Sequence, residues 1–182
     1  MKKLPGTTFE IGEMTEDVSQ GVFRTLFAGG GLMMSQVSSL TGLEPYMIQN
    51  WVKRGFLSSP QKKLYSKNQF CRIAIINMLK DSLQMDKICE LLSYINGRLD
   101  DEADDRMEDS GIYNVYCNLI VALKGKQLTD SVLEEETDKL TKNITEDETT
   151  RRRLKTVLTV MSLAHRASSL KTQAELKLCE LD

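Results

Sequence analysis

The chain has 182 residues, of which 41% are hydrophobic and 27% are charged, so it can bury one core, or one core plus a smaller appendage. No apolar run approaches the ~20 residues that a membrane-spanning helix needs, and no apolar segment follows the first lysines as it would in a signal peptide. Few prolines and aromatic residues argue against an all-β fold. We therefore predict a cytoplasmic protein that does not enter a membrane.

Four cysteines and one histidine give little basis for catalysis or metal binding. The cysteines lack the close spacing of a zinc or redox motif, so we expect each to be a small buried apolar residue: Cys71, Cys89, Cys117 and Cys179. His165 has no nucleophile, acid or metal ligand beside it in the sequence, which argues against a Ser–His–Asp set and a zinc site. We predict no catalytic residue, no metal and no cofactor.

Charge is divided unevenly along the chain, although the net charge is only −2. Between Gly31 and Lys80 there are seven Lys or Arg residues against Glu44 alone, which gives +6 and leaves −8 for the remainder. Seven acids fall within "DDEADDRMED", residues 100–109. This pattern predicts a basic module joined to an acidic one, with a solvated acidic linker at 98–110.

The first predicted elements are short. Residues 1–31 form an N-terminal extension of undefined role, in which Thr15 to Ala28 is a candidate helix that ends at three glycines. A short helix follows, with Met33, Val37 and Leu40 on one face. Gly42 favours a tight exit from that helix, because glycine adopts positive φ easily.

The next helix, predicted from Pro45 to Arg54, has two different faces, and proline suits its first position. Hydrogen-bonding side chains share one face: Tyr46, Gln49, Asn50 and Lys53. The opposite face carries Met47, Ile48, Trp51 and Val52, and we expect Trp51 in the core. Two short helices joined by a glycine-containing turn, the second with a polar face, are typical of a helix-turn-helix.

Residues 56–65 predict a short β-hairpin with Ser58–Gln61 at its tip. Ser66 and Gln69 have the spacing of a capping box, and the helix that they begin is apolar nearly all round. A fourth helix carries apolar residues from Met85 onward at helical spacing and closes at Asn96–Gly97.

Three further helices are predicted in the C-terminal region, 111–182. They cover about 112–123, about 131–142, and a longest helix that starts from a capping box of Thr145 and Glu148. Its apolar stripe consists of Leu154, Val157, Leu158, Met161 and His165. Because this region is rich in amphipathic helix and poor in bulky core residues, we predict that it forms the interface of a homodimer, with its apolar stripes pairing across a two-fold axis.

Together these elements predict an all-α fold: a winged helix-turn-helix head with a small β-wing at 32–97, followed by a helical C-terminal region. The head resembles the DNA-binding head of MerR-type regulators, which runs helix, turn with "TG", recognition helix, wing ending in Arg-x-Tyr-Ser/Thr, and two helices. The corresponding pieces are "SQVSSLTGLEPYMIQNWVKRGFL", "KKLYS", "QFCRIAIINMLKD" and "LQMDKICELL".

This chain departs from the MerR pattern in two places. "QNW" stands where the family commonly has Arg-Tyr-Tyr, and Lys63 takes the place of the wing arginine. The whole chain also resembles a family of uncharacterised bacterial proteins with a MerR-like head and a helical tail, which implies no established activity.

A helix that reads bases in the major groove needs side chains such as Gln or Asn for adenine and Lys for guanine. Gln49, Asn50 and Lys53 offer that chemistry on one face. Phosphate contacts need cations and hydroxyls beside the reading helix. The further DNA-binding candidates are Ser35, Gln36, Tyr46, Arg54, Lys62, Lys63, Tyr65 and Lys67.

The sequence therefore predicts a sequence-specific transcription regulator that binds double-stranded DNA as a homodimer. The alternative is a protein–protein interaction module that uses the same surface without binding DNA; an enzyme is the least favoured class, because no set of titratable groups can be assembled. Whether a small-molecule effector binds is open. Tyr113, Tyr116 and Cys117 lie near an apolar face, where core packing is the commoner role.

Overall fold

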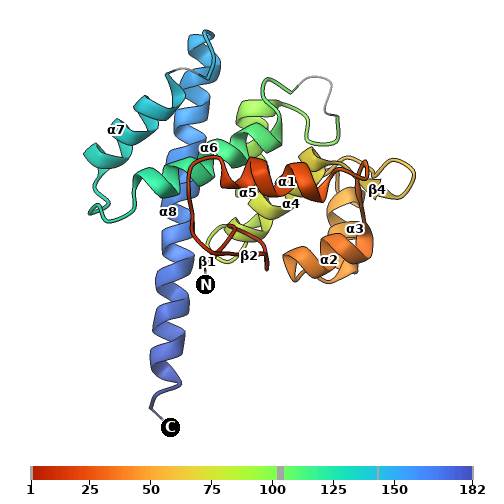
Figure 1. Ribbon diagram of the computed structural model, residues 1–182, viewed down its shortest axis with the longest axis horizontal. Coiled ribbons are helices and arrows are strands. Elements are labelled where there is room, and N and C mark those ends of the chain that lie inside the picture. Colours follow the sequence, from red (N-terminus) through yellow and green to blue (C-terminus); the bar gives the residue numbers. More distant parts are fainter. Residues whose placement is uncertain (1, 102–104, 143, 182) are drawn as a thin grey trace.

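The structure, a computed structural model, describes residues 2–101, 105–142 and 144–181. In these ranges the chain forms eight helices and two small antiparallel sheets (Figure 1). The helices are α1 Val18–Leu26, α2 Met34–Thr41, α3 Pro45–Lys53, α4 Lys67–Leu79, α5 Met85–Asn96, α6 Asp109–Ala122, α7 Asp130–Thr141 and α8 Glu148–Leu178. The strands are β1 Lys2–Lys3, β2 Glu10–Ile11, β3 Leu32–Met33 and β4 Leu64–Tyr65. The predicted all-α class is confirmed in its coarse form, a mostly helical chain.

Helix α4 lies at the centre of the molecule. Ser66 caps it by accepting a hydrogen bond from the backbone N–H of Gln69, whose side chain in turn accepts from the N–H of Ser66, so the predicted capping box is confirmed. Nearly every side chain of α4 is buried, as its continuous apolar sequence predicts. The helix packs against α2 and α5 on the head side and against α6 and α8 on the tail side.

Head and tail share one hydrophobic core, which runs from Leu4 to Ala164 in the sequence. Helix α6 contacts α1, α4, α7 and α8, and α5 contacts α8. The apolar stripe of α8 is buried inside this core at Leu154, Val157, Leu158 and Met161. The prediction that this stripe pairs across a dimer axis is therefore wrong, because the chain's own helices already cover it.

The N-terminal extension is a strap that joins both halves. The Tyr113 hydroxyl of α6 donates to the carbonyl of Pro5 at 2.7 Å, and the backbone N–H of Thr8 donates to the carbonyl of Leu40 in α2 at 2.8 Å. Gly6 has φ +68°, and an added Cβ would lie 1.9 Å from the backbone oxygen of Ala74 in α4. Only glycine allows this close approach.

The acidic segment at 98–109 is not a solvated linker throughout. Arg72 of α4 is fully buried, and its guanidinium contacts Asp105 at 3.2 Å and Asp109 at 2.6 Å; the two carboxylates are 7% and 1% exposed. The same guanidinium donates to the carbonyl of Leu99. The prediction of a fully solvated linker is wrong here, because α4 holds a cation that these acids neutralise. Glu102 and Asp104 lie outside the described residues.

Three smaller predictions also need correction. Helix α8 begins after Asp147, whose carboxylate accepts from the N–H groups of Thr149 and Thr150, so the predicted capping box at Thr145 is wrong. Cys179 is exposed rather than buried. His165 does have a partner, since its Nδ1 lies 2.7 Å from the Tyr116 hydroxyl of α6.

The buried ion pairs of Arg72 give a prediction about stability. Arg72→Met should lower the free energy of unfolding by about 3–5 kcal/mol, because it leaves two buried carboxylates without a counter-charge. The triple variant Arg72→Met/Asp105→Asn/Asp109→Asn should recover much of that loss, because no buried charge remains. Urea denaturation followed by circular dichroism measures both; a triple variant no more stable than the single one contradicts the role of charge.

Candidate nucleic-acid interface

Helices α2 and α3 form a compact pair whose geometry follows from four residues. Gly42 ends α2 with φ +72°, its N–H donating to the carbonyl of Ser38, and Pro45 occupies the first turn of α3. Ile48 and Trp51 are buried, which anchors the inner face of α3 in the core and confirms the core assignment of Trp51. The turn residue and the helix start expected from the sequence are both confirmed.

The side chains on the outer face of α3 take no part in the hydrogen bonds and ion pairs of the fold, within the described residues. Tyr46, Gln49, Asn50 and Lys53 are all exposed, and none of their side chains has a hydrogen-bond or ion-pair partner within the described ranges. Side chains that a fold does not use for its own hydrogen bonds remain available to a ligand. The face predicted to read bases is therefore presented to solvent as a continuous polar strip.

The predicted hairpin over 56–65 is wrong in its pairing and in its tip. Strand β4 pairs with β3, which precedes α2, with Leu32 opposite Tyr65 and Met33 opposite Leu64. The tight turn lies at Gln61–Leu64, where the Leu64 N–H donates to the Gln61 carbonyl at 2.8 Å. Because the buried Leu32 and Tyr65 face one another across this ladder, core packing decides the pairing rather than the local turn signals.

Lys62 and Lys63 occupy the two central positions of that turn with φ +49° and +67°. Positive φ at both positions defines a type I′ turn, for which Asn-Gly is the preferred sequence. A left-handed conformation costs an ordinary residue about 1–2 kcal/mol. Two exposed lysines therefore occupy positions where a non-glycine residue strains the backbone. Within the described residues, neither side chain makes a contact that would offset this strain. Strain of this kind is concentrated at functional sites.

Helix α3 and the segment just before β4, which contains the Lys62–Lys63 turn, lie at the same end of the molecule (Figure 1). Helix α2 packs against both α3 and β4 and so fixes one relative to the other. Lys53, the last residue of α3, is also exposed there. In the sequence eight residues lie between Lys53 and Lys62, and the fold places α3 and the turn at one end of the molecule.

Four other predicted DNA contacts are less available to a ligand than the outer face of α3: Gln36, Arg54, Tyr65 and Lys67. The Gln36 side chain accepts from the N–H of Met33 at 2.8 Å, which commits its carbonyl oxygen to the start of α2, although Ser35 beside it is exposed. Arg54 stacks on the Phe56 ring and pairs with Asp86 at 3.6 Å.

Tyr65 is only 2% exposed, and burial raises the pKa of its hydroxyl. Its ring packs in the core as predicted, but the predicted phosphate contact has almost no surface, so we remove Tyr65 from the interface. Lys67 is exposed and also lines a second hollow, between α1 and α6, so a ligand in that hollow would compete with the predicted phosphate contact for its ammonium group.

Two acids of the segment 98–109 lie beside the turn. Asp100 and Asp101 line the same open hollow of about 710 Å³ as Lys62 and Ser66. The side chain of Arg98 donates two hydrogen bonds to Asp100, which lowers the pKa of that carboxyl and keeps it charged at neutral pH. A polyanion that reached the Lys62–Lys63 turn would meet this negative charge. No local sequence pattern signals this charge, because 39 residues lie between Pro60 and Asp100.

Other candidate sites receive no support from the geometry. Tyr113 and Cys117 are fully buried in the core, and burial raises the pKa of the Cys117 thiol to about 12. Tyr116 is also buried; it borders an open hollow of about 490 Å³ between α6 and α8, and its hydroxyl is already bonded to His165. In the described ranges, no three His, Cys, Asp or Glu side chains are grouped closely enough to hold a metal ion. None of the described helices combines the length and apolar character that crossing a bilayer requires.

Comparison with known proteins gives one match. Residues 32–119 match a family described as "Domain of unknown function (DUF1836)", which is slightly less than half of the chain. The matched region starts at β3 and ends within α6, so it crosses the predicted boundary between head and tail. It contains Arg72 together with both of its carboxylate partners. Neither the curated proteins nor the solved structures gave a match.

The strained turn gives a prediction that separates the effect of backbone strain on stability from the effect of the lysine charges. Lys62→Asn/Lys63→Gly should raise the free energy of unfolding by about 1–2 kcal/mol, and Tm by roughly 3–6 °C, because Asn-Gly adopts the type I′ turn without strain. Differential scanning calorimetry measures the change. Lys62→Ala/Lys63→Ala removes the same charges but keeps non-glycine residues at positive φ, so an equal gain in that control contradicts the explanation.

Proposed function

We propose that this protein binds double-stranded DNA, with α3 as the reading helix of a winged helix-turn-helix and the Lys62–Lys63 turn as its wing. The observation that carries the proposal is the juxtaposition of an unused polar helix face with two strained, exposed lysines at one end of the molecule. Gln49 and Asn50 have the chemistry for adenine edges, and Lys53 for guanine. The turn lysines would contact phosphates, which position the reading helix.

A transcription regulator is the role that fits this chemistry, as in the MerR-type regulators that the head resembles. A single head of this size buries a small interface with DNA, and two copies on two half-sites would bind more tightly.

The C-terminal half of α8 supports the proposal that two copies of the chain associate. This helix has 31 residues, roughly 46 Å at ~1.5 Å per residue, and its lower part projects away from the body (Figure 1). Every residue from Ser169 to Leu181 is exposed. An isolated helix of this length is marginal in water, so a packing partner would stabilise it.

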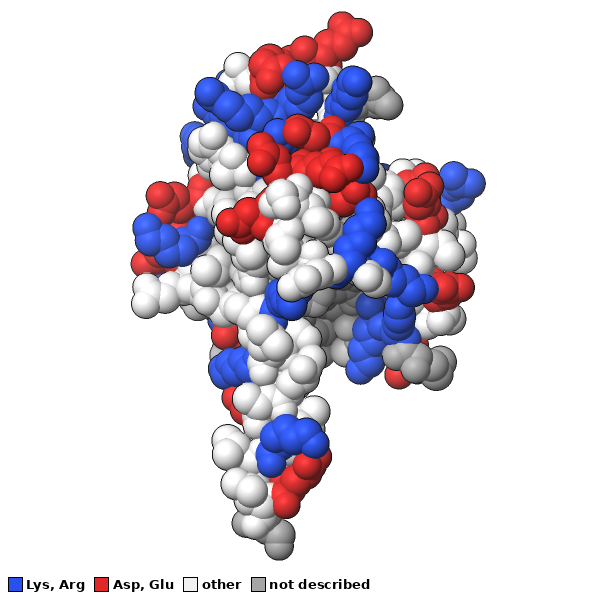
Figure 2. Space-filling model, turned by 90° about the vertical axis from the view of Figure 1, so that its left-hand side faces the viewer, with Lys and Arg blue, Asp and Glu red and all other residues white. Residues whose placement is uncertain are grey.

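The projecting part of α8 carries a narrow apolar stripe. Five residues at spacings of four, three, four and four fall on one helical face: Leu163, Ala167, Leu170, Ala174 and Leu178. The face visible in Figure 2 is mostly uncharged along this stem, with a small charged cluster near its end. Alternating leucine and alanine lets two such helices approach closely, so we propose that this stripe, in place of the buried Leu154–Met161 stripe, pairs two copies.

The DNA proposal is tested by charge reversal on the wing. Lys62→Glu/Lys63→Glu should weaken binding to all DNA sequences and lower the slope of log K against log salt by roughly 2, since each phosphate contact contributes about 0.9. Gln49→Ala should instead reduce discrimination between sites about tenfold or more, with little effect on bulk DNA. Fluorescence anisotropy on genomic fragments and on fragments selected from random DNA measures both.

The matched control for this test is Lys142→Glu/Arg152→Glu, two exposed cations just after α7 and near the start of α8, which makes the same change in net charge away from the wing. Equal weakening by both double variants contradicts the wing assignment. Wild-type protein that shows no salt-dependent binding to either DNA pool contradicts the DNA-binding function itself.

Removing nearby negative charge should increase affinity. Asp100→Asn/Asp101→Asn should strengthen DNA binding about threefold per carboxylate, which is the repulsion expected between unit charges roughly 6 Å apart in water. The gain should shrink at high salt. Asp130→Asn on α7 is the control and should leave affinity unchanged. An unchanged affinity for the double variant shows that the acidic segment does not face the bound DNA.

The alternative function, a protein–protein interaction module without DNA binding, is favoured by one observation. Tyr46 is 69% exposed and Met33 is 55% exposed at the same end of the molecule, and large apolar side chains at a surface are typical of protein interfaces. Failure to be retained on heparin, together with no mobility shift on bulk DNA, would favour this alternative over the first.

The dimer is tested by placing charge on the stripe of α8. Leu170→Glu should convert a dimer into a monomer at tens of micromolar in sedimentation velocity and should weaken DNA binding, because two linked heads gain affinity from each other. Leu176→Glu is the control, since Leu176 is equally exposed on the opposite face of α8. Monomeric wild-type protein at that concentration, or equal effects of the two variants, contradicts the stripe as the interface.

A further inference from the structure

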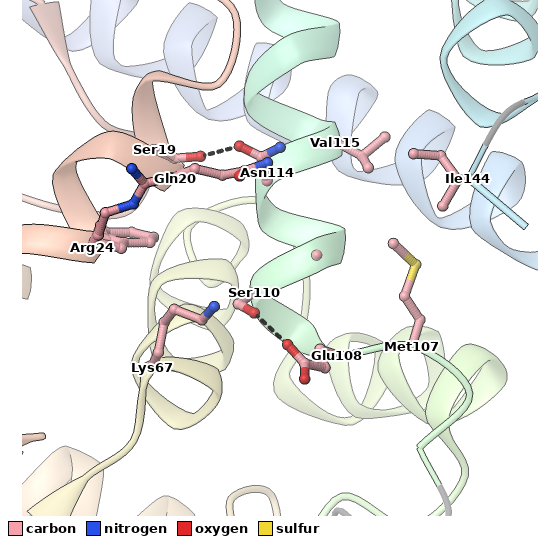
Figure 3. A pocket seen from close by; sticks show the side chains of 12 residues that line it. Ser19, Gln20, Arg24, Lys67, Met107, Glu108, Ser110, Asn114, Val115 and Ile144 are labelled. Carbon is pink, nitrogen blue, oxygen red and sulfur yellow. Dashed lines mark hydrogen bonds between the residues drawn. The ribbon is translucent and has the colours of Figure 1, made fainter. Parts of the chain in front are cut away.

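A hollow of about 470 Å³ lies between α1, the start of α4 and the start of α6 (Figure 3). This volume lies in the range of small-ligand sites. Its apolar lining is supplied by Phe23, Met107, Val115 and Ile144. Its polar lining is supplied by Ser19, Gln20, Arg24, Lys67, Glu108, Ser110 and Asn114, and Gly111 leaves room beside α6.

The charges around this hollow favour an anion. Arg24 reaches it from α1 and Lys67 from the first turn of α4, and neither has an ion-pair partner among the residues that the structure describes. Glu108 is the one acid in the lining, and its carboxylate already accepts a hydrogen bond from the Ser110 hydroxyl at 3.0 Å. Figure 3 shows Lys67 extending toward Ser110 and Glu108. Two cations against one occupied carboxylate leave a net positive site.

The floor of the hollow is fixed and in part apolar. Ser19 and Asn114 are buried, and the Ser19 hydroxyl donates to the Asn114 side-chain oxygen at 2.6 Å, while Asn114 donates in turn to Asp17. Phe23 and Val115 are buried beside them. A ligand that matches this lining has a negatively charged group for the cations and a compact hydrophobic body for the floor.

We propose that this hollow binds a small organic carboxylate with a hydrophobic body, its carboxylate held by Arg24 and Lys67. The proposal extends to regulation, and that part rests on the proposed DNA-binding function. Lys67 directly follows Ser66 and β4, and Asn68 beside it accepts a hydrogen bond from the backbone N–H of Ser110 at 3.3 Å. A carboxylate that engages Lys67 removes one cation from the DNA side of α4, so the bound ligand lowers affinity for DNA.

The site is tested first without DNA, on the full chain, by isothermal titration calorimetry and ¹⁵N NMR with benzoate, phenylacetate and hexanoate as probes. At least one carboxylate should bind, and its neutral amide should bind at least tenfold more weakly. Shifted resonances should include those of Ser110, Gly111 and Asn114. No binding by any carboxylate at millimolar concentration, or equal binding of acid and amide, overturns the site.

Variants then distinguish the contribution of the two cations from that of the open volume of the hollow. Arg24→Gln and Lys67→Gln should each weaken carboxylate binding about tenfold, whereas Arg152→Gln, an exposed arginine on α8, should leave it unchanged. Gly111→Leu should block binding with both cations intact, because an added Cβ there meets only the flexible end of Met107, at 3.1 Å, and a longer side chain fills the hollow. Wild-type affinity in Gly111→Leu overturns this location of the site.

The regulatory part has its own measurement. Saturating carboxylate should weaken DNA binding several-fold in wild-type protein, as expected for the loss of one phosphate contact, and should have no effect in Gly111→Leu. If the carboxylate binds and DNA affinity does not change, the coupling is refuted and the site stands. If the protein binds no DNA at all, the proposed function fails, while calorimetry still decides the site.

Discussion

The buried guanidinium of Arg72 is the interaction on which the arrangement of this molecule depends. A charge taken out of water is costly unless it is neutralised, and here the compensation comes from Asp105 and Asp109, with the Leu99 carbonyl as a third partner. One cation in the central helix therefore holds Leu99, Asp105 and the start of α6 against α4. Because α6 also contacts α1, α7 and α8, this single group orients the C-terminal region on the head.

Because of these buried ion pairs, the charge on the surface differs from the charge counted along the sequence. The excess of cations in the first half of the chain includes one that never reaches the surface, and the acids that follow include two that are buried with it. Other members of the acidic segment, Asp100 and Asp101, lie next to the Lys62–Lys63 turn instead. The positive character of the proposed DNA-binding end is therefore local, on the turn and at Lys53, with negative charge close by.

The proposed interface and the proposed ligand hollow share the start of α4. Ser66 caps that helix after the short β3–β4 ladder, and Lys67 and Asn68 turn toward α6, one lining the hollow and the other bonding to Ser110. The strap formed by residues 2–17 holds α2, α4 and α6 in one assembly through Thr8, Gly6 and Tyr113.

The sequence by itself determined the local elements. Helical periodicity located the helices from α2 to α8 to within a few residues, the Ser66–Gln69 capping box marked the start of α4, and Gly42 and Pro45 marked the turn between α2 and α3. The exposed face of α3 was likewise readable from spacing, since every fourth residue of a helix returns to the same side. Only the tertiary structure decided the partner of β4, the place of the tight turn, the burial of Asp105 and Asp109, and the internal coverage of the α8 stripe. Each of these depends on residues far apart in the chain, and local patterns carry no information about which distant surface neutralises a charge or covers an apolar face.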